Sequence, residues 1–132
     1  DALAAAGEPY TVVAGNTNFT SAAIPIPIPI SPTLAGRFTD HDLILVRTDA
    51  LKHISVSNAR SLNFSADSSF TVSLFGLPIL VERGWSTVDL TQRGRTFRFV
   101  NTHLEAFGST PLRDEWRNQQ AAELVADLAS SP

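Results

Sequence analysis

Residues 84–103 read Gly84-Trp-Ser-Thr-Val-Asp-Leu-Thr91, then Gln92-Arg-Gly94 and Arg95, then Thr96-Phe-Arg-Phe-Val-Asn-Thr-His103. Polar and apolar side chains alternate along both outer runs, which is typical of half-buried β-strands. The short central run carries a glycine at a place where a tight hairpin turn needs a positive φ. This pattern predicts an antiparallel hairpin, and it indicates a fold that is built largely from antiparallel sheet.

Beyond this hairpin, the spacing of apolar residues changes to that of a helix over residues 111–129. Thr110 suits the N-cap, and Pro111 suits the first helical position, where its missing N–H costs nothing. We therefore predict one long helix with an apolar face towards the sheet. That face consists of Trp116, Ala121, Leu124, Val125 and Leu128.

The segments before the hairpin predict the end of a helix over residues 1–6, followed by several strands. Residues 24–30 alternate isoleucine and proline, so they must be extended and suit an edge strand or a clamped loop. The order of elements predicts an α/β (α+β) fold: a layered sandwich on a mostly antiparallel sheet, with the C-terminal helix packed on it. Further strands are predicted at residues 10–14, 43–47, 54–57 and 70–75, and the second of these is predicted to be buried.

Composition fits a single folded domain over residues 1–132. Of the 132 residues, 43% are hydrophobic and 17% are charged, which is enough apolar material for a core and argues against disorder. The sequence contains no cysteine, so disulfides, thiolate zinc sites and cysteine nucleophiles are excluded. The net charge of −3 argues against a surface that coats nucleic acid. The apolar runs are too short to predict a membrane-spanning helix.

The most chemically informative residues lie at the end of the strand predicted over residues 95–103. Phe97, Phe99, Asn101, His103 and Glu105 share one face of that strand, and we expect the two phenylalanines to lie in the core. The other three side chains stand where a sheet fixes them and a loop gives access. His103 suits a general acid, or a donor to a developing charge. The alternative is that the asparagine and histidine merely end the strand and bond to the next loop.

Asp40-His41-Asp42 is a second polar cluster. Neighbours on a strand face opposite ways, so only Asp40 and Asp42 could share a ligand. A polar start to a strand with a capping aspartate is the simpler interpretation, and we assign no metal ligands. The hairpin is also flanked by arginines, which suit phosphate contacts but equally protect sheet edges. These arginines are Arg83, Arg93, Arg95 and Arg98.

Four segments, taken in order, resemble the endonuclease/exonuclease/phosphatase superfamily of deoxyribonuclease-like nucleases, sphingomyelinases and inositol-phosphate phosphatases. The most specific of them is Phe99-Val-Asn-Thr-His-Leu104, followed by a helix that carries Arg117, Gln120 and Leu124. The resemblance implies a four-layer α/β sandwich that hydrolyses phosphate esters, usually with magnesium. The matching segments are residues 36–47, 83–85, 95–105 and 117–124.

The resemblance also implies roles for individual residues. His103 matches the family's histidine near the scissile phosphate, and Asn101 would orient the strand end beside it. Glu105 is expected to bind substrate at the rim of the pocket. Arg98 of the hairpin is also expected to bind substrate, because arginine suits phosphate contacts. The helix residues Arg117 and Gln120 are expected to tie the helix to the sheet.

The sequence departs from the family in its metal ligands. The family's metal ligands include an asparagine and a glutamate that precede the part of the domain seen here, and its Gly-Asp-x-Asn motif and final Asp-His pair follow that part; the sequence has no counterpart of these motifs. We therefore expect the central part of such a domain, one that keeps His103, binds no divalent cation tightly and is inactive alone. Magnesium or another divalent cation would act in the intact domain.

The expected partner is a phosphate-ester substrate, with nucleic acid, a phospholipid head group and a small molecule all open. An alternative of another class is a non-catalytic β-rich binding or interaction module. Its contact surface would be residues 24–30 together with the arginine-bearing hairpin. Two observations would separate the two functions: the presence of the missing motifs in the same gene, and hydrolysis of a phosphodiester.

Overall fold

A computed structural model describes residues 2–25, 35–74, 76–106 and 110–131. The fold belongs to the α+β class, with mostly antiparallel sheets and one long C-terminal helix, as the sequence predicts. No helix among these residues has the length and apolarity needed to cross a membrane. The helices are α1 (Ala2–Ala5), η1 (Ala50–Lys52), η2 (Ala66–Ser68) and α2 (Pro111–Ser130). The strands are β1 (Tyr10–Thr20), β2 (Ile24–Pro25), β3 (Ala35–Gly36), β4 (Thr39–Arg47), β5 (Ser55–Asn63), β6 (Phe70–Leu74), β7 (Leu77–Val81), β8 (Gly84–Gln92) and β9 (Arg95–His103).

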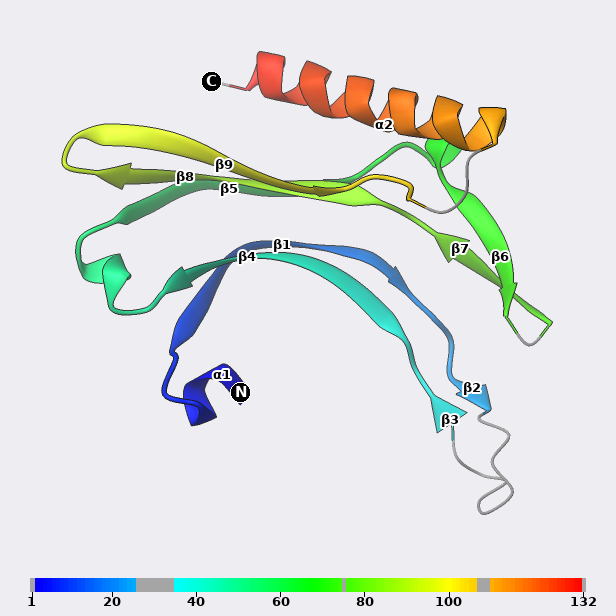
Figure 1. Ribbon diagram of the computed structural model, residues 1–132, viewed down its shortest axis with the longest axis horizontal. Coiled ribbons are helices and arrows are strands. Elements are labelled where there is room, and N and C mark those ends of the chain that lie inside the picture. The colour runs from blue at the N-terminus through cyan, green and yellow to red at the C-terminus, as the bar shows by residue number, and fades with distance from the viewer. Residues whose placement is uncertain (1, 26–34, 75, 107–109, 132) are drawn as a thin grey trace.

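The elements lie in layers (Figure 1). A three-stranded antiparallel sheet has β8 at its centre, between β5 and β9. Helix α2 lies along one face of this sheet, and the antiparallel pair β1–β4 lies against the other face. The small pairs β2–β3 and β6–β7 extend from the end of the layers where β9 finishes (Figure 1). Strand β8 is therefore covered on both faces and paired on both edges, and its first six residues are buried.

The central hairpin forms as the sequence predicts. β8 and β9 pair from Gly84 opposite His103 to Gln92 opposite Arg95. Both turn residues have positive φ, 51° at Arg93 and 73° at Gly94, which is the geometry of a type I′ turn. This turn has the same right-handed twist as its two strands, so it fixes the register that places His103 at the far end.

Helix α2 begins at Pro111, as the sequence predicts. The Thr110 hydroxyl accepts the backbone N–H of Arg113 at 3.4 Å, and the helix ends one residue later than predicted. The predicted apolar face is wrong at Val125, which is 65% exposed. Gln120 is buried instead: it accepts the Glu105 N–H and donates to the Ser68 carbonyl, both at 2.8 Å. The helix is thus attached by buried hydrogen bonds as well as by apolar contact, and the tethering role predicted for Gln120 is confirmed.

Two predictions about the core are wrong. Phe97 and Phe99 are 57% and 50% exposed, because β9 is an edge strand and its contacts with β4 lie nearer the His103 end, at Asn101 and His103. Leu43 and Leu45 are exposed, because they point to the face of β1–β4 turned away from the central sheet. That face also carries Tyr10 and Val12, and no other sheet of the described residues lies over it (Figure 1).

The proline-rich segment is described only where it begins. Ile24 and Pro25 form β2, which pairs with β3, so this short part is extended as predicted. Residues 26–30 of the predicted edge strand or clamped loop lie outside the described residues. The strand predicted at residues 10–14 continues to Thr20, and the extra length carries part of the candidate site.

A cross-strand ion pair gives a prediction about acid stability. Asp89 of β8 accepts two hydrogen bonds from Arg98, at 2.7 and 2.8 Å, and one from Asn58 at 2.9 Å. The arginine bonds first, and then the asparagine bond, lower the pKa of Asp89 from 3.8 to about 2. A lowered pKa in the folded state stabilises the fold above the unfolded value, and this contribution is lost as pH falls towards 2.

We therefore compare urea unfolding of the parent chain and of Asp89→Asn between pH 6 and pH 2. The difference in free energy of unfolding should stay constant above about pH 5 and shrink below about pH 4. Asp49→Asn is the control: Asp49 pairs with Arg47 at 3.0 Å, and both side chains are more than half exposed, so its effect should be smaller. A difference that persists unchanged to pH 2 would contradict the prediction.

Candidate functional site

The candidate site begins with an irregularity in β1. Thr17 pairs with His41 and Phe19 pairs with Asp40, so Asn18 is the extra residue of a β-bulge. A bulge redirects the side chain of the extra residue, and bulges are common beside functional sites. Here the Asn18 side chain turns into the space between the sheets and is completely buried. Its Oδ1 accepts a hydrogen bond from Asn16 at 2.9 Å, which fixes the orientation of the amide.

The amide nitrogen of Asn18 gathers two carboxylates. Its Nδ2 lies 3.2 Å from an oxygen of Asp40 and 2.8 Å from an oxygen of Asp42. His41, between them in sequence, points the other way and contacts the Thr17 hydroxyl at 3.0 Å. The prediction that only Asp40 and Asp42 face the same space is therefore confirmed.

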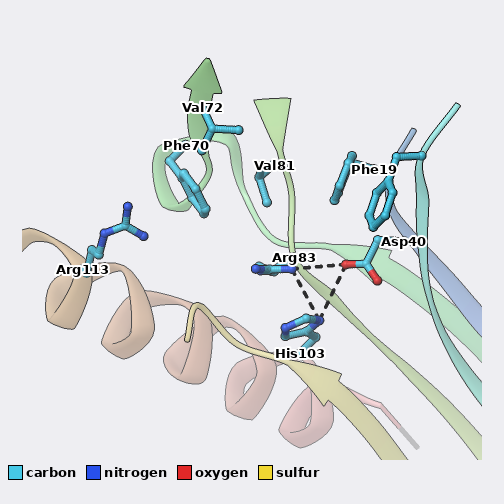
Figure 2. A pocket seen from close by; sticks show the side chains of 9 residues that line it. Phe19, Asp40, Phe70, Val72, Val81, Arg83, His103 and Arg113 are labelled. Atoms are coloured by element: carbon cyan, nitrogen blue, oxygen red, sulfur yellow. Dashed lines mark hydrogen bonds and ion pairs between the residues drawn. The ribbon is translucent and has the colours of Figure 1, made fainter. Parts of the chain in front are cut away.

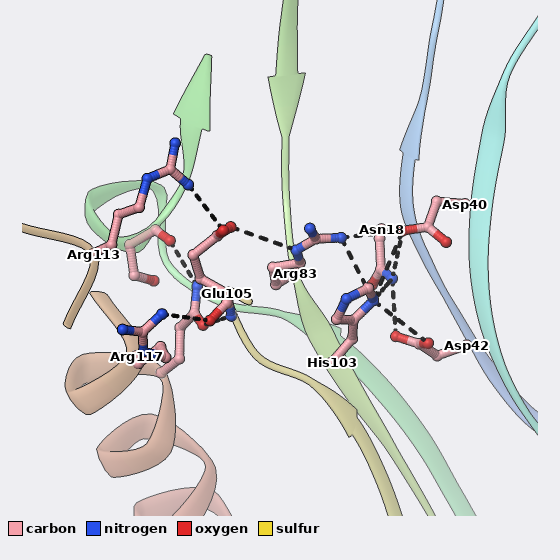
Figure 3. Close-up of polar contacts among 10 residues, drawn as sticks. Asn18, Asp40, Asp42, Arg83, His103, Glu105, Arg113 and Arg117 are labelled. Atoms are coloured by element: carbon pink, nitrogen blue, oxygen red, sulfur yellow. Dashed lines mark hydrogen bonds and ion pairs between the residues drawn. The ribbon is translucent and has the colours of Figure 1, made fainter. Parts of the chain in front are cut away.

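His103 reaches the same cluster from the other sheet (Figure 3). Its Nδ1 lies 3.4 Å from Nδ2 of Asn18 and 3.5 Å from Nη1 of Arg83. It also lies 3.8 Å from one oxygen of Asp40 and 3.8 Å from one of Asp42. In the neutral ring, an Nδ1 that accepts from these N–H groups leaves its proton on Nε2. His103 is thus held by four side chains, and its side chain stays one-third exposed.

Arg83 joins this cluster to the buried carboxylate of Glu105. Its side chain is 4% exposed, with Nη1 3.2 Å from Asp40 and Nε 3.7 Å from Glu105. The Glu105 carboxylate is fully buried and also accepts from Arg113 of α2 at 2.9 Å. Figure 3 shows the resulting row of alternating charges, from Arg113 through Glu105 and Arg83 to Asp40. Such a row fixes each side chain, because a displaced member would leave a buried charge without its partner.

The structure changes the places assigned to two predicted substrate-binding residues. Glu105 is buried between Arg83 and Arg113, and the prediction that it lies at a pocket rim is wrong. Arg98 pairs with Asp89 five residues along β9 from His103, on the face turned to α2, and its Nη1 donates to the Ser131 carbonyl. The sheet therefore does not bring Arg98 to His103.

Asn101 shares the inner face of β9 with His103, as predicted. Its Nδ2 donates to the backbone carbonyl of Leu43 at 3.4 Å, so it ties the edge of β9 to β4. This contact supports the strand end on which His103 stands. Arg117 donates to the Glu105 carbonyl at 3.3 Å, which confirms its expected role of tying helix to sheet.

A cavity of about 500 Å³ opens beside the cluster (Figure 2). Asp40, Arg83 and His103 lie together on one side of it, and Arg113 approaches from α2. Aromatic and aliphatic side chains form the rest of its lining: Phe19, Phe38, Phe70, Val72 and Val81.

The carboxylates of this cluster do not form a metal site by themselves. Among the described residues, no group of three or more histidine, aspartate or glutamate side chains is placed to hold a metal ion. Asp40 faces the Arg83 guanidinium, and both Asp40 and Asp42 accept from Asn18, so their oxygens already have positively polarised partners. The magnesium ion implied by the resemblance therefore lacks a ligand set in these residues.

Comparison of the chain with protein-family models, with curated protein sequences and with solved structures finds no match. What the arrangement can do follows from its own chemistry. An imidazole and a guanidinium side by side at a cavity suit recognition of an anionic oxygen, and the two aspartates hold them in place. The sequence indicated His103 and the aspartate pair, but it gave no sign that a bulge would bring Asn18 between them.

Proposed function

We propose that this chain is part of a metal-dependent phosphoesterase of the endonuclease/exonuclease/phosphatase type, in which His103 contacts the phosphate. The finer fold we propose is part of the layered deoxyribonuclease-like sandwich. One observation carries the proposal: His103, the residue that matches the family's histidine, lies at a cavity in a fixed cluster with Arg83, Asn18 and two aspartates.

In this proposal the cluster acts by positioning donors. His103 donates a hydrogen bond from Nε2 to a phosphoryl oxygen, where negative charge grows in the transition state, or, as the imidazolium, protonates the leaving group and is left as the neutral ring. Arg83 adds positive charge behind the imidazole, while Asp40 and Asp42 keep both side chains oriented. Arg83, Asn18 and the aspartates are thus positioning residues, and His103 is the residue that touches the substrate.

Magnesium, when bound, would polarise the phosphoryl oxygens and lower the pKa of a water molecule. Because the described residues do not fit the ion, we derive no step through it. The missing ligands would come from further polypeptide of the same protein, and the 132 residues alone would be inactive. The test must therefore include both the 132-residue chain and the full product of its gene.

The direct test is hydrolysis of bis-p-nitrophenyl phosphate with and without magnesium. We expect activity only in the full gene product and only with the metal. His103→Ala should lower kcat by roughly 10²–10⁴-fold, the usual contribution of a positioned acid or base. His53→Ala is the matched control, since His53 lies at the end of η1, and it should leave kcat unchanged.

Two results would contradict the proposal. One is a full-length protein that folds but shows no magnesium-dependent hydrolysis, which would favour the non-catalytic binding module instead. The other is a His103→Ala variant that keeps full activity, which would remove the residue on which the assignment depends.

A further inference from the structure

The cavity beside His103 has two unlike parts. Three phenyl rings and two valines line most of it: Phe19 and Phe38, whose rings stack at 5.8 Å, together with Phe70, Val72 and Val81. These side chains carry no hydrogen-bonding groups. The polar atoms gather on one side, where Asp40, Arg83 and His103 meet (Figure 2). A ligand that fits this distribution has one charged end and an otherwise apolar body.

Arg113 connects the two parts. Its guanidinium lies over the Phe70 ring at 4.9 Å and near the Trp116 ring at 5.9 Å, while Nη1 donates to Glu105. The aromatic contacts and the buried carboxylate hold this charge at the boundary between the apolar wall and the polar side. Its side chain remains about one-quarter exposed, at 27%, so an anionic ligand can approach it from the cavity.

We propose that this cavity is a subsite for an apolar aryl or alkyl group that is esterified to phosphate. The inference rests on the proposed function, because it places the phosphate at His103 and the organic group against the phenyl and valine side chains. The volume of about 500 Å³ lies within the range of pockets that enclose small organic ligands. Burial of a hydrocarbon or aryl group there removes apolar surface from water on both partners.

The same chemistry disfavours a nucleotide in this cavity. A nucleobase carries donors and acceptors on its edge, and walls of phenylalanine and valine offer them no partners. A buried polar group without a hydrogen bond loses its solvation without replacement. The substrate class is therefore an aryl or alkyl phosphate ester.

The test is binding by isothermal titration calorimetry to the 132-residue chain, without metal. The probes are 1-naphthyl phosphate, octyl phosphate, adenosine monophosphate and inorganic phosphate. We expect the naphthyl or the octyl ester to bind at least ~10-fold more tightly than the nucleotide and inorganic phosphate. The tighter of these two esters identifies the apolar group as aryl or alkyl. Equal or tighter binding of the nucleotide would overturn the inference.

Two variants test whether the esters bind in this cavity. Val72→Glu puts a charge on its wall, and Phe38→Ala removes one exposed ring; each should weaken binding of the preferred ester at least ~5-fold. Val12→Glu is the matched control, because Val12 is an exposed strand valine on the outer face of β1–β4, away from the cavity. Unchanged binding in both cavity variants would overturn the assignment.

The alcohol 1-naphthol separates this inference from the proposed function. If the cavity variants weaken both 1-naphthol and 1-naphthyl phosphate while the full gene product shows no hydrolysis, the apolar subsite stands and the phosphoesterase proposal fails. If magnesium-dependent hydrolysis is found but both cavity variants leave ester binding unchanged, the subsite inference fails alone.

Discussion

Gly84→Ala should lower the free energy of unfolding by about 3 kcal/mol, the upper end of the usual cost of overpacking a well-packed site. A Cβ at residue 84 would stand closer than 3.0 Å to the side chain of Asn16 and to the backbone carbonyl of Leu62. The carbonyl belongs to β5, which pairs with β8 at this point, so it cannot retreat without opening the central sheet. Asn16 is also constrained, because it donates to the Asn18 amide.

Gly15→Ala is the matched control for this substitution. Both glycines lie in strands, and neither has a positive φ, so the backbone effects of adding a methyl group are similar. A Cβ at residue 15 would meet the Cδ2 of Leu43 at 2.6 Å, but that is the end of a flexible, exposed side chain. The backbone carbonyl oxygen of Asp42 would lie 3.3 Å from the added Cβ. We expect a cost below about 1 kcal/mol.

Urea unfolding followed by the fluorescence of buried Trp85 measures both changes. Equal stability of the two alanine variants would show that β1 and β5 leave room around residue 84. We expect the substitution to affect the candidate site as well as stability, because Gly84 pairs with His103 across the hairpin. A shift of β8 here would move the histidine away from Asn18 and Arg83.

Much of the fold follows from local sequence signals. The hairpin of residues 84–103 and the helix after Thr110 depend on turn geometry, alternation and capping, which act within a few residues. These elements form where predicted. The predicted core fails at Phe97, Phe99 and Val125, because strand alternation and helical spacing identify residues that share a face but do not tell what covers that face.

The candidate site was predictable only in part. Strand periodicity correctly placed Asp40 and Asp42 on one face, and the strand end correctly drew attention to His103. Asn18 joins the two aspartates to His103. It is the extra residue of a bulge in β1, beyond residue 14, where the predicted strand ends. A bulge depends on how two strands pair, so a single strand's sequence does not reveal it.

Glu105 shows a second limit of the sequence. Glu105 is predicted from the sequence to lie at the rim of a pocket, just past the end of the strand that carries His103. The structure buries it because two arginines far apart in the chain converge on it, Arg83 before β8 and Arg113 in α2. This convergence depends on how α2 lies over the sheet, and it leads to the second large prediction.

Glu105→Gln should lower the free energy of unfolding by about 3–5 kcal/mol, the range seen when one partner of a buried ion pair is removed. The substitution keeps the size of the side chain but removes its negative charge. Arg83, which is 3% exposed, would then lose its contact with Glu105 and keep its ion pair with the partly exposed Asp40. Arg113 would lose the carboxylate that it contacts at 2.9 Å. Thermal and urea unfolding of the variant measure the loss.

Glu123→Gln tests whether the loss comes from charge. Glu123 of α2 accepts from the Ser65 backbone N–H at 2.9 Å and from its hydroxyl at 2.7 Å, and no arginine contact is present among its hydrogen bonds and ion pairs in the described residues. An amide can still accept one of these bonds, so the cost should stay below about 1.5 kcal/mol. A double-mutant cycle of Glu105→Gln with Arg113→Gln should give a coupling energy of about 1–3 kcal/mol. A coupling near zero would mean that the Glu105–Arg113 pair does not account for the loss in Glu105→Gln, and that Arg113 adds nothing to the stability of the row of alternating charges.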